Sequence, residues 1–244
     1  KTIVPNKVER KMVLLILFQT PGKDLNTFSL YIITLGLIIG ALLNVFYARS
    51  SKNRKSQLKM AAGWICWAIS YIIISIRLII PIENAQMHIT LYQIILTLDA
   101  FGFSCFFFFL GEYLEITGIQ SGIFQKKIFV ATGWALFLVQ VPFIWIVGGF
   151  GVIDTPFGVE ILPSFVCQNI MATTMIVGGI IFLASSRAFS KQNNKILAWI
   201  SMVLATFIIV LILHIFTTVI LGHSIFSGVV LLLARIFLGG CAIL

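Results

Sequence analysis

Charged residues are scarce in this chain: they make up 10% of its 244 residues, whereas hydrophobic residues make up 59%. A soluble domain carries roughly 25% charged residues, so this chain could not cover a water-facing surface with polar groups. This scarcity excludes a soluble enzyme and a soluble binding module. The hydrophobic runs recur along the whole sequence and leave no stretch for a soluble core, so we expect one membrane domain whose main partner is the lipid bilayer.

Histidine and cysteine are also few, with three and four copies. The sequence contains no CxxC pair, and no histidine lies near a cysteine at metal-ligand spacing. It also lacks HExxH, GxSxG, a glycine-rich phosphate loop before a lysine, and paired intramembrane aspartates. We therefore predict no enzymatic activity, no metal site and no cofactor.

The net charge of +9 would indicate an anionic partner in a soluble protein. Here the basic residues form short clusters between hydrophobic runs, which is the pattern that sets the orientation of membrane helices. We therefore predict no nucleic-acid partner.

Hydrophobic runs long enough to cross a bilayer occur seven times. A helix needs about 20 apolar residues to span the roughly 30 Å hydrocarbon layer. The runs lack the alternation of barrel strands, and backbone groups in lipid must be paired, so each run is predicted to be helical. The predicted fold class is all-α, a polytopic membrane helical bundle of about seven transmembrane helices. The runs cover about 27–48, 60–81, 88–111, 128–149, 161–185, 196–221 and 224–244.

Residues 1–26 precede the first of these runs and are predicted to form an extracytoplasmic, interfacial segment. The hydrophobic stretch from Met12 to Phe18 is too short to span a bilayer. Pro21 and Gly22 are expected to break it from the helix that follows. The seven-helix transmembrane domain then covers residues 27–244.

Basic residues mark the first, third and fifth connections between runs, whereas the even connections carry acidic residues. The positive-inside rule then places the N-terminus outside, the C-terminus inside and the protein in the cell membrane as a multi-pass chain. The basic N-terminal segment argues the other way. The basic residues are Arg49, Lys52, Arg54, Lys55, Lys59, Lys126, Lys127, Arg187, Lys191 and Lys195, and the acidic ones are Glu83, Asp154 and Glu160.

Gly36 and Gly40 in the first run follow the small-xxx-small pattern that lets two helices approach closely. The same pattern serves both dimers and contacts within one chain. We favour close packing within the chain.

Two charged residues lie deep inside hydrophobic runs, where a charge is costly. Asp99 follows His88 by eleven residues, and Arg235 follows His223 by twelve. At about 1.5 Å per residue, both lie roughly 17 Å below the outer surface. We predict an interhelical ion pair, either as a structural clamp or as a switch that a ligand or a proton opens.

Other polar residues lie at similar depth in the outer half of the predicted bundle. Asn169 shares a helix face with Thr173, and His214 shares one with Thr217 and Thr218. These residues form either a polar cavity open to the outside or ordinary hydrogen bonds between helices and to i−4 carbonyls, and both interpretations stay open. With Asp99 and Arg235, the candidate binding residues are Arg77, Gln93, Gln140, Gln168, Asn169 and His214.

The stretch LLLARIFLG, residues 231–239, is similar to the last helix of microbial rhodopsins, in which a lysine holds retinal. Arg235 occupies that place here, and no lysine lies in any of the seven runs. Because a guanidinium cannot form the Schiff base, we expect no retinal.

Two further motifs resemble the seven-helix sensor region of prokaryotic histidine kinases and related signalling proteins. They are the spacing Trp64-x-x-Trp67-x-x-x-Tyr71 and the stretch FFFFLGEYL, residues 106–114. The resemblance covers residues 27–244. It implies an outward-facing sensing bundle whose seventh helix connects to a cytoplasmic output domain.

The sequence thus predicts an integral membrane sensor or receptor-like domain that relays an external or intramembrane signal to the cytoplasm through its seventh helix. The signal would bias the helix packing around Asp99, Arg235 and His214. One alternative is a non-catalytic accessory subunit of a larger membrane complex. Another is a small transporter, although no internal repeat is visible. The candidate partners beyond lipid are a small-molecule ligand and other membrane subunits.

Overall fold

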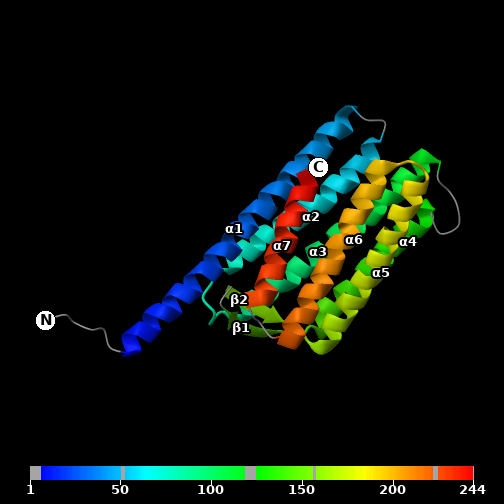
Figure 1. The fold of residues 1–244 in the computed structure, drawn as a ribbon. Helices are drawn as coiled ribbons and strands as arrows, with labels where there is room; N and C mark the ends of the chain where they lie inside the picture. The colour runs from blue at the N-terminus through cyan, green and yellow to red at the C-terminus, as the bar shows by residue number, and fades with distance from the viewer. Residues whose placement is uncertain (1–6, 51–52, 119–124, 156–157, 222–224, 244) are drawn as a thin grey trace.

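The described part of the chain contains seven α-helices (Figure 1). The computed structural model describes residues 7–50, 53–118, 125–155, 158–221 and 225–243, with side chains from residue 26 onward except chiefly at 214–228. The helices are α1 (Lys7–Ser50), α2 (Arg54–Arg77), α3 (Ala85–Thr117), α4 (Lys126–Pro142), α5 (Phe165–Lys191), α6 (Lys195–Leu221) and α7 (Ile225–Ile243).

Five helices in this part are long and apolar enough to cross a membrane. The prediction of an all-α membrane helical bundle is therefore confirmed. The five segments are Asn26–Arg49, Arg54–Arg77, Ala85–Ile116, Lys126–Val147 and Phe165–Lys191.

The helices contact one another in a closed ring. Each helix from α1 to α6 packs against the next one in sequence, and α7 packs against both α6 and α1. In Figure 1, α7 accordingly lies between α1 and α6. The ring is closed by helices that are far apart in the sequence, so it encloses a space that several helices can line.

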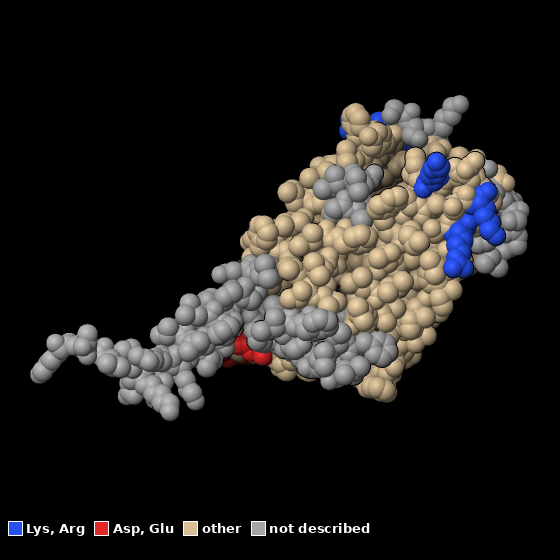
Figure 2. All heavy atoms as spheres, in the orientation of Figure 1, with Lys and Arg blue, Asp and Glu red and all other residues tan. Residues whose placement is uncertain are grey.

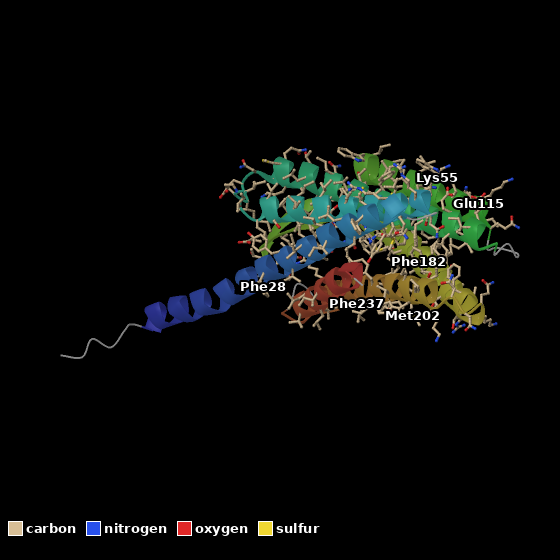
Figure 3. The ribbon with its side chains drawn as sticks, turned by 90° about the horizontal axis from the view of Figure 1, so that it is seen from above. Phe28, Lys55, Glu115, Phe182, Met202 and Phe237 are labelled. Atoms are coloured by element: carbon tan, nitrogen blue, oxygen red, sulfur yellow. The ribbon has the colours of Figure 1, made fainter. Side chains whose placement is uncertain are left out.

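The core of the bundle is built from aromatic side chains around α3. Among the five candidate spans this helix is the most deeply buried. Phe107 of α3 stacks on Phe182 of α5 with ring centroids 4.8 Å apart. Figure 3 shows Phe182 inside the bundle, whereas Phe28 and Phe237, which are 59% and 40% exposed, project from its outer surface.

Glycine allows α1 and α7 to approach at backbone distance. A Cβ added to Gly36 would overlap the backbone oxygen of Gly239, and one added to Gly40 would overlap the backbone oxygen of Ala242. The prediction that Gly36 and Gly40 mediate close packing within the chain is therefore confirmed. Without side chains at these positions, the two helices can bury their backbones against each other.

The expected break at Pro21 and Gly22 is wrong, since both residues lie inside the continuous helix α1. Proline removes one hydrogen bond from a helix, but its fixed φ is still helical, and a long helix can continue through it. The location of residues 1–26 relative to the membrane stays a prediction.

A two-stranded hairpin occupies most of the predicted connection between the fourth and fifth runs and includes the first two residues of the predicted fifth helix. Strands β1 (Gly151–Thr155) and β2 (Gly158–Leu162) pair antiparallel, and Gly151 lies opposite Leu162. It follows a π-helical segment, Phe143–Val147. Proline at position 142 has no N–H to donate, which favours such a widened turn directly after it.

On the face that Figure 2 shows, the lysine and arginine side chains lie at one end of the bundle and the acidic side chains lie toward the other. At one end, Glu112 of α3 accepts a hydrogen bond from Lys59 of α2 at 2.5 Å and lies 3.2 Å from Lys126 of α4. Lys126 also lies 2.7 Å from Glu115. This network joins α2, α3 and α4 at the end that carries the basic connections.

Candidate functional site

A cavity of about 270 Å³ lies inside the ring, lined by residues from α2 through α7. Its apolar wall includes Phe103, Met171 and Phe207. Its polar lining is formed by Trp67, Tyr71, Tyr92, Asp99, Gln140 and Arg235. Three of the eight predicted site residues line this cavity: Asp99, Gln140 and Arg235. Four others lie outside its lining, namely Arg77, Gln93, Gln168 and Asn169.

Arg235 projects from α7 toward α1 and α2, and its side chain is buried. Its Nη1 donates hydrogen bonds to Oδ1 of Asn26 and, at 3.4 Å, to Oγ of Ser29. The guanidinium carbon lies 5.9 Å from the ring centroid of Tyr71, within the range of a cation–π contact. Nε of Arg235 is buried and has no hydrogen-bond partner among the described atoms. The described partners of the guanidinium are thus neutral groups, and among the described side chains no carboxylate lies within ion-pair distance of it.

Asp99 projects from α3 into the same cavity. Its backbone oxygen accepts a hydrogen bond from Nε1 of Trp67 at 3.1 Å, which fixes the indole against α3. Among the described side chains, no cation lies within ion-pair distance of its carboxylate. The predicted ion pair between Asp99 and Arg235 is therefore wrong. Counting residues gives the depth of each side chain along its helix, but not the side of the helix from which it projects. Arg235 projects toward Asn26 and not toward Asp99.

Gln140 connects the two helices that have the fewest contacts in the ring, α4 and α5. Its Nε2 donates to Oγ1 of Thr174 at 2.6 Å, and that hydroxyl donates to the backbone oxygen of Met171 at 2.8 Å. Both Gln140 and Thr174 are buried. This hydrogen bond therefore holds one side of the cavity closed.

We expect Gln140→Leu and Thr174→Val to show coupled effects on stability. Thr174→Val leaves the Gln140 amide without its acceptor, and Gln140→Leu removes the donor to the Thr174 hydroxyl, so the double variant should lose less than the sum of the two. Hydrogen bonds between membrane helices are worth about 0.6 kcal/mol on average and up to about 1.7, so we expect a coupling energy of about 1 kcal/mol. Unfolding in mixed detergent–SDS micelles measures it. Asn169→Ala, at an exposed position of α5, should combine additively with Gln140→Leu.

Gln93 satisfies a carbonyl in the π-helical segment. Its Nε2 donates to the backbone oxygen of Ile144 at 3.1 Å. Irregular backbone at membrane depth needs such a partner because no water is available there. Gln93 therefore has a structural role next to the cavity, not a position in its lining.

Arg77 joins the end of α2 to the hairpin. Its Nη2 donates to the backbone oxygen of Val159 in β2 at 3.2 Å, and its guanidinium carbon lies 5.4 Å from the ring centroid of Tyr92. Tyr92 in turn packs edge-on against Phe150, with ring centroids 5.6 Å apart. Arg77 thus contacts both the hairpin and a tyrosine that lines the cavity.

Gln168 and Asn169 do not contribute to the cavity, contrary to the pocket interpretation. Nε2 of Gln168 donates to the backbone oxygen of Pro163 at 3.1 Å, and Nδ2 of Asn169 donates to that of Phe165 at 2.7 Å. Asn169 and Thr173 do share a face of α5, but that face is exposed. Gln168 and Asn169 therefore form local backbone hydrogen bonds. His214 lies in α6, outside the residues whose side chains the structure describes.

No family model, curated protein or solved structure matches this chain. The resemblance to a seven-helix sensor region therefore stays a prediction from two motifs. Among the described residues, no group of three or more His, Cys, Asp or Glu side chains gathers at metal-binding distance.

Four residues that shape this site are absent from the predicted site residues: Trp67, Tyr71, Asn26 and Ser29. Trp67 and Tyr71 were identified only as part of the spacing that resembles the sensor region. Trp67 and Tyr71 are spaced i, i+4, so they share a face of α2, and this spacing was visible in the sequence. Asn26 falls at the boundary between the predicted N-terminal segment and the first run. A short polar residue at the end of a hydrophobic run gives no signal that it will reach an arginine on another helix.

Proposed function

We propose that this chain is a receptor-like sensor domain of the cell membrane, with seven transmembrane helices, its N-terminus outside and its C-terminus inside. The basic residues of the first, third and fifth connections support this orientation. The network of Lys59, Glu112 and Lys126 lies at the end that would face the cytoplasm.

The cavity is the single observation that carries the proposal. Six helices line it, and opposite charges on α3 and α7 face it without forming an ion pair. A bound group that neutralises either charge changes the electrostatic energy of the bundle, by an amount that depends on how the helices are packed. Occupants that favour one arrangement over another shift the population of states, which is the requirement for a sensor.

Helix α7 is the element that would transmit the change. It carries Arg235 toward the cavity, and it packs on α1 through Gly239 and Ala242. Contacts between small residues offer little side-chain interlocking along the helix axis. Shifts of about 1–2 Å at such helix interfaces are a common form of switching.

Spin labels on the full chain in lipid nanodiscs test this proposal. One label replaces Lys55 near the beginning of α2, and the other replaces Phe237, which is 40% exposed on α7. Asp99→Asn removes one cavity charge, as a bound cation would neutralise it, and should shift the distance distribution by at least about 1 Å.

Glu83→Gln is the matched control, because Glu83 is exposed in the connection between α2 and α3, away from the cavity lining. The control should leave the distance distribution unchanged. If Asp99→Asn gives the same distribution as the unmodified protein, α7 does not respond to the cavity charge and the sensor proposal is wrong.

A further inference from the structure

Among the described side chains, neither Asp99 nor Arg235 has a counter-charge at ion-pair distance. Arg235 contacts the carboxamide of Asn26, the hydroxyl of Ser29 and the ring of Tyr71. Its side chain is buried, and its Nε has no hydrogen-bond partner among the described atoms. Asp99 has no cation at ion-pair distance among the described side chains. Both side chains nevertheless line one cavity.

Unpaired charges of opposite sign in one membrane cavity are costly, and joining them directly would relieve the cost. The protein instead keeps them apart by holding Arg235 against α1. A molecule that carries both an ammonium and a carboxylate could compensate both charges at once. A molecule with a single charge would leave one of them uncompensated.

The rest of the cavity favours a small apolar body between the charged groups. Phe103, Met171 and Phe207 form apolar wall, and methionine adapts its shape to different side chains. A volume of about 270 Å³ lies just below the roughly 300–1,000 Å³ typical of drug-sized ligand pockets. This size suits a ligand no larger than a single amino acid.

We propose that the cavity binds a free α-amino acid with an apolar side chain, with the ammonium at Asp99 and the carboxylate at Arg235. The apolar side chain lies against the aromatic and methionine wall. This inference rests on the proposed sensor function and names the ligand class of the same site.

Calorimetric titration of the full chain in nanodiscs with three related probes tests the charge requirement without any variant. L-Phenylalanine carries both charges, phenethylamine only the ammonium, and 3-phenylpropionate only the carboxylate. Losing one partner of a buried charge pair costs about 2–5 kcal/mol, so each singly charged probe should bind at least about 30-fold more weakly. L-Leucine and L-methionine extend the zwitterionic series.

Variants then assign each charge to its residue. Asp99→Asn should weaken L-phenylalanine at least about 30-fold while leaving 3-phenylpropionate unchanged, because that probe has no ammonium. Arg235→Leu should have the converse effect, leaving phenethylamine unchanged. Glu83→Gln, outside the cavity lining, should alter none of the three affinities.

Two results would overturn the inference. One is binding of phenethylamine or 3-phenylpropionate as tight as that of L-phenylalanine, which shows that one charge is sufficient. The other is that none of the twenty common amino acids binds at millimolar concentration. In either case the spin-label distances decide separately whether Asp99 controls α7, so a wrong ligand class is distinguishable from a wrong function.

Discussion

Replacing Gly36 by leucine should separate α1 from α7 and lower the free energy of unfolding by about 3 kcal/mol. The new Cβ would overlap the backbone oxygen of Gly239, and a backbone atom cannot move aside as a flexible side chain can. The helices must therefore part, and the contacts that close the ring on this side are lost. Because α7 carries Arg235, the same change should also pull the guanidinium away from Asn26.

Unfolding in mixed detergent–SDS micelles, followed by tryptophan fluorescence, measures the loss. Leu35→Phe adds bulk at the preceding residue, which is 60% exposed, and should leave the unfolding midpoint within error of the unmodified protein. Light scattering of both variants checks the oligomeric state. A Gly36→Leu chain that unfolds normally but changes its oligomeric state would show that this glycine pair serves a dimer, contrary to the structure.

Most of the helices could be predicted from the sequence because lipid imposes a simple rule. Hydrophobic runs of spanning length must be helical, and charged connections must end them. The errors occur in segments to which this rule does not apply. Asp154 and Glu160 mark residues 151–160 as a connection between runs, but composition does not indicate that this connection pairs as two strands.

The sequence predicts how deep the site residues lie in the bundle, but not the direction in which their side chains project. Asp99, Gln140 and Arg235 were identified by polarity inside hydrophobic runs, and all three line the cavity. Asn169 satisfied the same criterion and is exposed. Sequence periodicity shows which residues share a face of a helix, but only the packing of neighbouring helices shows which face is enclosed. For the same reason, matched depth wrongly paired Asp99 with Arg235.

The contact between Asn26 and Arg235 predicts an unusual order of stabilities. Asn26→Leu should cost about 2 kcal/mol, because it removes a hydrogen bond to a guanidinium that stays buried. Arg235→Leu removes the charge together with the cost of keeping it away from water, so it should cost less than about 1 kcal/mol. The smaller change is therefore expected to be the more harmful one.

A double-mutant cycle tests whether the cost of Asn26→Leu comes from the charge of Arg235. In the Arg235→Leu background there is no charge left to satisfy, and Asn26→Leu should then cost less than about 1 kcal/mol, which gives a strong coupling between the two sites. Unfolding in mixed micelles measures all four chains under the same conditions. Ser29→Ala removes the longer hydrogen bond of 3.4 Å and should have a smaller effect than Asn26→Leu. If Arg235→Leu instead costs more than Asn26→Leu, the guanidinium stabilises the bundle in its own right. Its charge is then compensated within the protein, and it does not need a ligand to compensate it.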